Sequence, residues 1–273
     1  MNLQDKRIVL TGASSGIGRA LAVALSSEGA QLVLVARRVH LLEKLSDEIA
    51  GNGHAPPTVI SADLSMPGAA ATVGAGVLDA FDGAVDIVIN NAGANLTGAL
   101  SGLGDTAAAR SVFEVNLWAP LALAATILPT MLAAGSGTVV NVTSTVQAVP
   151  LPLLGYYAAS KAALAQATRS LRLELAETPV RVVEVIPGAT DTDLRDIDEL
   201  PWKTTPPPTL PPVTAGAMAA AIIRGLKRDA SRIVYPVYSL APLELPVIGR
   251  LIAGVGGRRV DTAGALTRQR KEQ

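Results

Sequence analysis

Several residue types that usually mark a function are missing or scarce in this chain. It has no cysteine, which excludes disulfides and thiolate metal sites and leaves the redox compartment open. Its formal net charge is zero, so the overall charge gives no sign of nucleic acid or of an acidic partner. Charged residues make up 17% of the chain, against roughly 25% in an average globular protein. This shortage predicts extensive burial, in a core or between subunits.

Histidines and targeting signals are equally sparse. His40 and His54 fall in helix or loop contexts away from any cluster of metal ligands, so we expect no metal and two exposed histidines. Residues 1–7 place their charges directly before an apolar run, without the pattern of a signal peptide. Residues 117–136 are uncharged over a membrane-spanning length, but Pro120 and Pro129 interrupt them and alanine dominates. A buried or subunit-interface helix is the better interpretation, and a soluble, cytoplasmic protein is expected.

Apolar, β-rich runs alternate with helical patterns along the chain, which predicts a doubly wound parallel sheet with helices on both faces. With no linker or repeat, the 273 residues are expected to form a single domain. The expected strands are Arg7–Thr11, Gln31–Ala36, Thr58–Ala62, Val85–Asn90, Thr138–Thr143, Val180–Ile186 and Arg232–Tyr235. The expected helices are Ile17–Glu28, Val39–Ala50, Gly68–Ala80, Thr106–Ala134, Gly155–Glu177 and Thr214–Arg228.

A glycine-rich loop joins the first strand to the first helix. Its sequence, residues 11–18, is Thr-Gly-Ala-Ser-Ser-Gly-Ile-Gly. Glycines let a backbone turn sharply and approach a pyrophosphate, which the N–H groups of a helix N-terminus attract. The spacing differs from the commoner G-x-G-x-x-G, and a turn without a ligand is the alternative.

The second strand ends at Ala36, where an NAD-selective site usually has an acidic residue for the ribose. Arg37 and Arg38 follow and could instead hold a 2′-phosphate by charge-assisted hydrogen bonds, helped by the Ser14 hydroxyl. Two solvated arginines opening a helix are the alternative. The pattern favours NADP(H), with NAD(H) as the second choice.

Other strand ends also carry candidates. Asp63, followed by Leu64, would lie beside an adenine ring, or else cap a helix. The pair Asn90 and Asn91 could hold strand ends together, while Ala92 and Gly93 leave room for a cofactor. After the sixth strand come Pro187, Gly188, Thr190 and Thr192, whose N–H and hydroxyl groups could bind a carboxamide or phosphate or simply cap the next segment.

A pair of side chains four residues apart is the strongest candidate for catalysis. Tyr157 and Lys161 would share one face of a helix, whereas Tyr156 would point away. An ammonium beside a phenol favours the phenolate and draws the tyrosine pKa down from about 10. Tyr157 is therefore a plausible general acid or base, the alternative being an ordinary amphipathic helix. The hydroxyls of residues 143–145 could face a ligand, and Asn116 in its apolar helix could bend that helix or join a proton relay.

Two segments stand outside the alternating pattern. Residues 193–214 are rich in proline and irregular, and their place after the sixth strand suits a substrate lid. Residues 237–273 form an extension, apolar over 237–254 except for Glu244 and Arg250, which could wall a pocket, pair with another subunit or rest on a membrane surface, the last not favoured. The polar end, 258–273, is expected to fray.

Taken together, these motifs resemble the short-chain dehydrogenase/reductase (SDR) family over residues 7 to about 192. The resemblance implies a seven-stranded Rossmann-type sheet and selects Ser144, thirteen residues before Tyr157, to hold the substrate oxygen. It implies that Tyr157 transfers the proton, that Lys161 binds the nicotinamide ribose, and that Asn116 keeps a water relay. The implied cofactor residues are Gly12, Ser14, Ser15, Gly16, Ile17, Gly18, Arg37, Arg38, Asp63, Leu64, Asn90, Ala92, Gly93, Tyr157, Lys161, Pro187, Gly188, Thr190 and Thr192.

The function expected from this resemblance is NADP(H)-dependent interconversion of a carbonyl and an alcohol, in the direction of reducing a fairly apolar ketone or aldehyde. The alternative is a non-catalytic NADP(H)-binding regulator, or an interaction protein that uses the apolar tail. Family analogy also implies a homodimer or homotetramer built through the helices at 106–134 and 155–177. Thr190 replaces a common valine, and the tail after 236 exceeds the family core.

Overall fold

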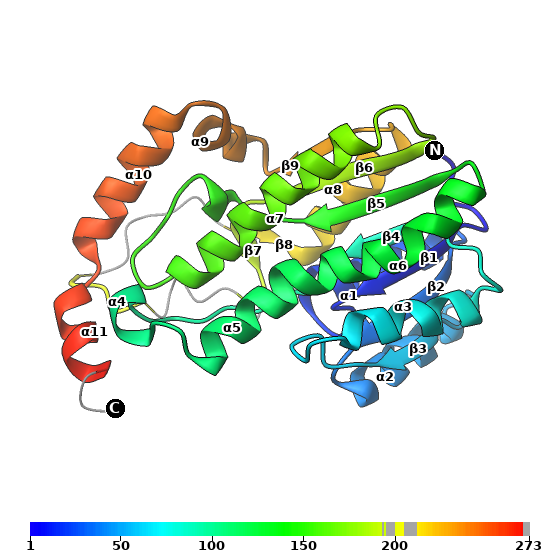
Figure 1. The fold of residues 1–273 in the computed structure, drawn as a ribbon, viewed down its shortest axis with the longest axis horizontal. Helices are drawn as coiled ribbons and strands as arrows, with labels where there is room; N and C mark the ends of the chain where they lie inside the picture. Colours follow the sequence, from blue (N-terminus) through cyan, green and yellow to red (C-terminus); the bar gives the residue numbers. More distant parts are fainter. Residues whose placement is uncertain (193, 195–199, 205–211, 270–273) are drawn as a thin grey trace.

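Seven parallel strands form the central sheet of the computed structural model, which describes residues 1–192, 194, 200–204 and 212–269. Apolar side chains fill both faces of the inner strands, because helices cover the sheet on each side. The Rossmann-type fold expected from the sequence is confirmed (Figure 1). In sheet order the strands are β3 (Thr58–Ser61), β2 (Gln31–Ala36), β1 (Arg7–Thr11), β4 (Ile87–Asn90), β5 (Gly137–Val142), β6 (Val180–Pro187) and β9 (Arg232–Tyr235).

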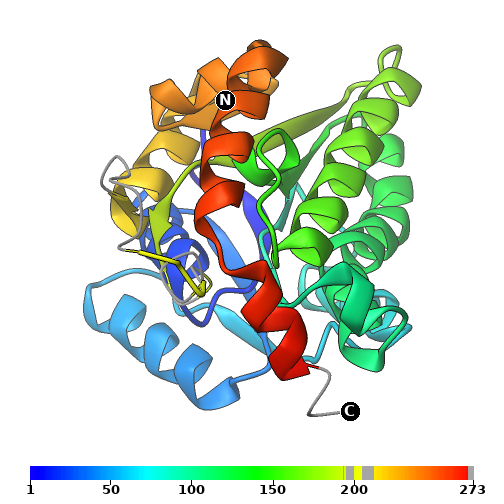
Figure 2. The ribbon, with the colours of Figure 1, turned by 90° about the vertical axis from the view of Figure 1, so that its left-hand side faces the viewer.

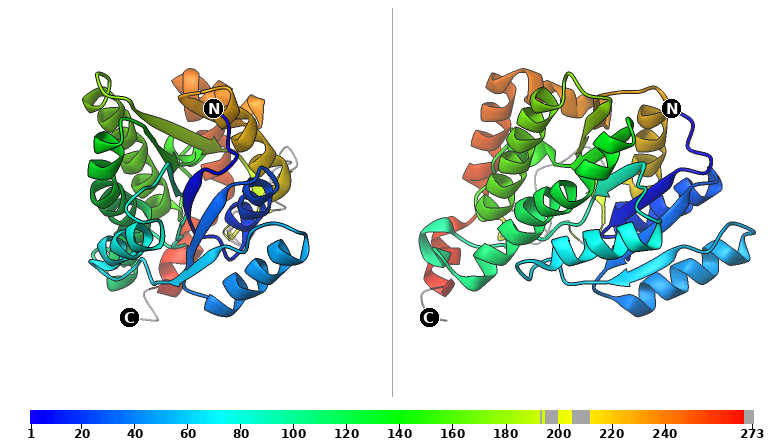
Figure 3. Two further views of the ribbon diagram at one scale, coloured as in Figure 1. Left: turned by 90° about the vertical axis from the view of Figure 1, so that its right-hand side faces the viewer. Right: turned by 45° about the vertical axis from the view of Figure 1, so that its right-hand side comes forward.

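Two layers of helices enclose two apolar cores (Figure 3). One core joins the sheet to α1 (Gly16–Ser27), α2 (Val39–Gly51) and α8 (Ala215–Lys227). The other joins it to α3 (Ala69–Ala80) and α6 (Ala119–Ala133), with α7 (Gly155–Glu174) beside them. Apart from the start of α6, the sequence placed the ends of these helices to within a few residues.

The helix predicted over 106–134 is continuous but changes its pitch. It consists of α5 (Ala107–Phe113), the π-helical turn η1 (Glu114–Trp118) and α6. The span Ala107–Ala133 is long and apolar enough to cross a membrane, by length and composition alone. However, Leu123, Ile127 and Met131 are fully buried against the sheet, as the interpretation of a buried helix requires.

Beyond the carboxyl ends of the strands lies the C-terminal extension (Figures 1 and 2). It forms the helices α9 (Leu240–Glu244), α10 (Pro246–Arg259) and α11 (Thr262–Gln269), after the short turn η4 (Val237–Ser239). The expectation that 258–273 frays is wrong up to Gln269, because residues 262–269 are helical. Smaller elements complete the chain: α4 (Leu100–Leu103), the 3₁₀ turn η2 (Thr145–Gln147), and the strand pair β7 (Thr190–Asp191) and β8 (Val213–Thr214).

Candidate functional site

A cavity of about 1110 Å³ opens at the carboxyl ends of the central strands. It lies where the strand order reverses between β1 and β4, the place where doubly wound sheets bind their ligands. The loop after β1 lines it on one side, and α9 and α10 line it on the other. One space therefore joins the predicted cofactor residues to the predicted catalytic residues.

The glycine-rich loop is shaped so that only glycine fits at two of its positions. Gly12 has φ +69°, and a side chain there would come within 2.7 Å of the Ala92 Cα. A side chain at Gly18 would overlap the Gly12 carbonyl oxygen. Helix α1 begins at Gly16, so its free N–H groups face the cavity. This cradle fits a pyrophosphate group.

Two arginines follow β2 at the rim of the cavity and do different things. Arg38 donates from Nη2 to the Ser14 and Ser15 hydroxyls, at 3.0 and 2.8 Å, and so braces the loop. Arg37 is 72% exposed, and its Nη1 lies 3.9 Å from the Asp63 carboxylate. Cation and hydroxyl donors thus meet at one rim, an arrangement that suits a phosphate monoester.

Asp63 does not cap a helix, since α3 begins six residues later behind Gly68. Its carboxylate accepts a hydrogen bond from the Ser65 N–H at 3.0 Å. That backbone bond, with the Ser65 side chain and the Arg37 charge, lowers the pKa of Asp63 against the opposing effect of burial. An ionised acceptor stands at the edge of the cavity as a result.

The side chains of Asn90 and Asn91 have structural partners. Asn90 donates to the Asn141 side chain at 2.8 Å, is 2% exposed and does not line the cavity. Asn91 donates to the Thr11 and Gly12 carbonyl oxygens, at 2.9 and 3.3 Å, and so ties the glycine-rich loop to the end of β4. The sequence predicts that the two asparagines hold strand ends together as a pair, and it assigns a cofactor contact to Asn90 but none to Asn91.

Asn116 lies in the π-helical turn and is completely buried. Its Oδ1 accepts from the Ala94 N–H, and its Nδ2 donates to the Ala94 oxygen, both at 2.8 Å. Nδ2 also donates to the Ser160 hydroxyl at 2.9 Å. The amide therefore ties the helix to the loop after β4 and to α7, next to Lys161. Like Asn90, Asn116 does not itself line the cavity.

Helix α7 brings Tyr157 and Lys161 to the cavity together. The Lys161 Nζ lies 6.0 Å from the centre of the Tyr157 ring and donates to the Val142 carbonyl oxygen at 2.9 Å. Burial lowers the pKa of this amine from 10.5 to about 8. Tyr156 points elsewhere, as its spacing predicted, and donates to the Gly104 oxygen at 2.6 Å.

All three hydroxyl residues after β5 line the cavity, and Ser144 also caps η2, where its Oγ accepts from the Val146 N–H at 3.3 Å. Thr143 is buried and bonds to Glu184 on β6. Glu184 was not identified from the sequence, although a lone carboxylate in an apolar strand is a visible signal.

The turn after β6 closes the cofactor side of the cavity. A side chain at Gly188 would overlap the Ser239 hydroxyl, and the Thr190 hydroxyl donates to the Gly188 oxygen at 3.1 Å rather than capping a helix. The Thr192 methyl group would meet any side chain placed at Gly16, so the turn lies over the glycine-rich loop.

The remaining walls of the cavity are largely apolar. They come from the loop after η2 and from the C-terminal helices. Of the lid predicted at 193–214, most falls outside the described residues, but Leu194 and Trp202 line the cavity. The apolar lining residues that η2, the loop after it and the C-terminal segment contribute are Val146, Val149, Leu151, Leu154, Tyr238, Ala241, Pro242, Ile248, Leu251, Ile252 and Val255.

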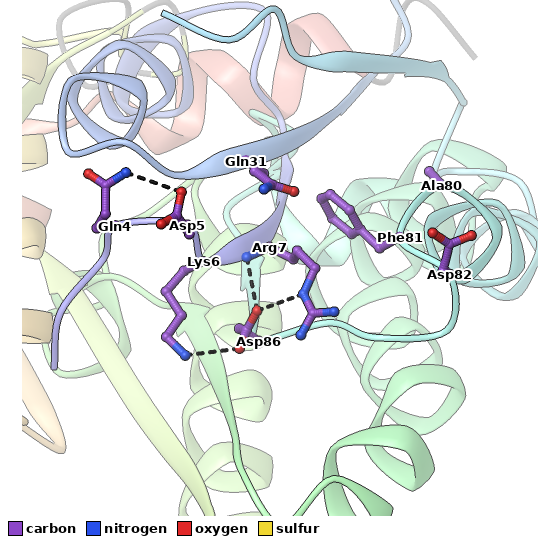
Figure 4. Close-up of a pocket in the computed structure, with 9 residues that line it drawn as sticks. All are labelled: Gln4, Asp5, Lys6, Arg7, Gln31, Ala80, Phe81, Asp82 and Asp86. Atoms are coloured by element: carbon purple, nitrogen blue, oxygen red, sulfur yellow. Dashed lines mark hydrogen bonds and ion pairs between the residues drawn. The ribbon is translucent and has the colours of Figure 1, made fainter.

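A second hollow, of about 550 Å³, lies at the opposite, amino edge of the sheet (Figure 4). Three of its charged groups bond to one another, since Asp86 lies 3.0 Å from both the Lys6 Nζ and the Arg7 Nε. Burial of Asp86 opposes ionisation, but hydrogen bonds from the Arg7 backbone and from both cations lower its pKa overall. This cluster clamps β1 to the start of β4.

Comparison with known proteins agrees with this arrangement. The short chain dehydrogenase family matches residues 6–199. The mouse protein named dehydrogenase/reductase SDR family member 7B is 38% identical over 197 residues, which cover 70% of this chain and 60% of that protein. The chain thus spans less than two thirds of the length of this relative.

Two solved structures share the fold. A short-chain dehydrogenase from Sphingobium yanoikuyae in complex with NADPH has a TM-score of 0.76 and 27% identity, over 90% of this chain and 94% of that one. A bulky-bulky ketone specific alcohol dehydrogenase from Comamonas testosteroni has a TM-score of 0.74 and 28% identity, over 92% and 94%. With its fold, its glycine-rich loop and its Ser144, Tyr157 and Lys161 on one cavity, the chain belongs to the short-chain dehydrogenase/reductase family.

Proposed function

We propose that the protein is an NADP(H)-dependent oxidoreductase that reduces an apolar ketone or aldehyde to the alcohol. The observation that carries this proposal is the meeting of Ser144, Tyr157 and Lys161 with the glycine-rich loop in one cavity. When bound, the cofactor supplies the hydride, and the protein supplies the proton and the alignment.

In this proposal Ser144 and Tyr157 hold the carbonyl oxygen, and Tyr157 gives it a proton as negative charge develops there. Lys161 hydrogen-bonds the nicotinamide ribose, and its positive charge stabilises the phenolate that remains. Burial brings the Lys161 pKa to about 8, so the buried ammonium destabilises the cofactor-free protein. A phenolate partner offsets this destabilisation. Asn116 and Ser160 position the helix turn from which a proton relay to Lys161 would start.

The preference for NADP(H) rests on the rim formed by Arg37, Arg38 and Ser14. The complex of the Sphingobium relative with NADPH supports this preference. An apolar substrate is supported by the apolar lining, and the bulky-ketone specificity in the name of the Comamonas enzyme points the same way. The oligomeric state and the cytoplasmic location stay predictions.

A matched pair of variants tests the chemistry. Tyr157→Phe should lower kcat for NADPH-dependent reduction of an aryl ketone about 100-fold or more, because the proton donor is lost. Tyr156→Phe removes the neighbouring hydroxyl, which bonds to Gly104 outside the cavity, and should keep the activity. Native turnover by Tyr157→Phe would overturn the mechanism. Cofactor binding without turnover by the native protein would favour the non-catalytic regulator instead.

A further inference from the structure

The C-terminal extension exposes an unusual number of apolar side chains. In the described part of the chain, fourteen large apolar side chains are exposed, and eight of them lie between positions 237 and 255. They are Val237, Tyr238, Leu240, Leu245, Val247, Leu251, Ile252 and Val255. Exposed apolar side chains concentrated in one segment are a sign of an interaction surface in a folded protein.

The packing of α10 explains why its large apolar side chains are exposed. The helix approaches the body of the protein through Gly249 and Gly256, where added side chains would meet the Ala148 oxygen and the Leu151 side chain. Val247, Leu251 and Val255 are spaced four residues apart, so they form a stripe on a different face. They are 58%, 63% and 55% exposed. The helix thus buries its smallest residues and presents its large ones.

Charge accompanies the apolar stripe. Residues 237–260 contain three basic side chains, Arg250, Arg258 and Arg259, and all three are exposed. Glu244 is the single acid in that segment, and it is paired with Arg232. An apolar stripe flanked by arginines is complementary to a bilayer surface with anionic headgroups, because the side chains enter the acyl boundary while the arginines meet the phosphates.

The same stripe borders the candidate site. Leu251, Ile252 and Val255 are exposed and also line the cavity, so the cavity opens beside the stripe. Figure 2 shows α10 and α11 running across the end of the molecule that faces the viewer.

We propose that α9 and α10 dock the protein peripherally on an anionic lipid surface, with the cavity mouth turned towards the bilayer. The consequence for the substrate rests on the proposed function: an apolar ketone dissolved in the bilayer would reach Tyr157 without crossing water. The docking itself can be tested without any measurement of activity.

The test is flotation of the full chain with vesicles of phosphatidylcholine, alone or with an equal part of phosphatidylserine. We expect binding to the mixed vesicles, weakened by salt. The Leu245→Ser, Val247→Ser double variant alters exposed residues that do not line the cavity and should bind weakly. A matched double variant, Val39→Ser with Met66→Ser, removes exposed apolar groups after β2 and β3, the strands farthest from β9 in the sheet, and should bind like the native chain. Arg258→Gln and Arg259→Gln should each weaken binding about fivefold.

Failure to float with the mixed vesicles would overturn the proposal. So would equal binding by the two double variants. If the native chain instead forms a dimer that Leu245→Ser with Val247→Ser dissociates, measured by light scattering without lipid, the surface is an interface between copies and the lipid proposal is wrong. None of these outcomes depends on ketone reduction, so they leave the proposed function to its own test.

Discussion

The carboxylate of Glu184 on β6 accepts a hydrogen bond from the hydroxyl of Thr143 at the end of β5, with 3.2 Å between Oε1 and Oγ1. The same oxygen accepts from the Gln147 amide at 3.2 Å, and the Arg169 Nε lies 3.8 Å from the other oxygen. Thr143 and Gln147 lie on either side of Ser144. A buried carboxylate therefore fixes both ends of the segment that carries the candidate catalytic hydroxyl.

Removing this carboxylate should weaken both the fold and the site. We expect Glu184→Ala to lower the free energy of unfolding by about 2 kcal/mol, because Thr143 and Gln147 lose a buried acceptor. Urea unfolding measures this loss, and kcat should fall as Ser144 loses its support. Glu177→Ala, at an exposed position three residues before β6, is the control and should change neither the free energy of unfolding nor kcat. A native kcat in a folded Glu184→Ala protein would show that the segment holds its shape without Glu184.

The glycine-rich loop allows a sharp comparison between two glycines. Gly18→Ala should cost at least ~2 kcal/mol and abolish cofactor binding, because the added methyl group overlaps the Gly12 carbonyl oxygen and crowds the Asn91 amide. At Gly51, at the end of α2, an added methyl group meets no atom within 4 Å. Gly51→Ala should therefore raise the free energy of unfolding by no more than about 1 kcal/mol. Thermal unfolding with and without NADPH separates these effects. A Gly18→Ala protein that NADPH still stabilises would contradict the cradle.

The two arginines after β2 should differ in their effect on cofactor choice. Among the ion pairs of the described residues, Arg37 contacts only the Asp63 carboxylate, at 3.9 Å. Arg37→Ala should therefore weaken the binding of NADPH at least about tenfold and leave the binding of NADH little changed. Arg38 braces Ser14 and Ser15, so Arg38→Ala should weaken both cofactors. Fluorescence titration with each cofactor measures the two ratios. Equal losses of NADPH and NADH in Arg37→Ala would refute the phosphate clamp.

Much of this architecture could be read from the sequence because its signals are local. Apolar runs such as Val180–Ile186 and glycine spacing in residues 11–18 depend on neighbouring residues, and the structure places the strands where these signals predicted them. Because the motifs follow successive parallel strands, their order along the chain also predicts that they meet at the carboxyl edge of the sheet. All the predicted cofactor residues except Asn90 line the cavity, and so do Ser144, Tyr157 and Lys161.

What the sequence did not show depends on contacts between distant segments. Asn91 and Asn90 are alike in sequence, and only the approach of β1 to β4 decides which amide holds the loop. Glu184 acquires its role from pairing with β5, forty-one residues away. From the sequence the extension could be a pocket wall, an interface or a surface anchor, and only the packing shows that Gly249 and Gly256 are buried while Leu251 and Val255 are exposed and line the cavity.

Burial of Lys161 should make the stability of the cofactor-free protein depend on pH. The charged amine is disfavoured in the fold, so its pKa is about 8 there, against about 10.4 in the unfolded chain. Between these values the unfolded state binds more protons, and stability rises with pH; below about pH 8 the full cost of burying the charge is present.

Replacing this lysine by a neutral side chain should therefore remove a pH-dependent cost. Near neutral pH, the free energy of unfolding of Lys161→Met should exceed that of the native protein by up to about 3 kcal/mol, and this difference should shrink towards about pH 10. Urea unfolding across this range, in the absence of cofactor, measures the difference. Lys44→Met, at an exposed position on α2, is the control and should run parallel to the native curve. If the free energy of unfolding of Lys161→Met depended on pH as it does in the native protein, the Lys161 amine would titrate as it does in water. The Tyr157 phenolate would then not be stabilised by a buried cation.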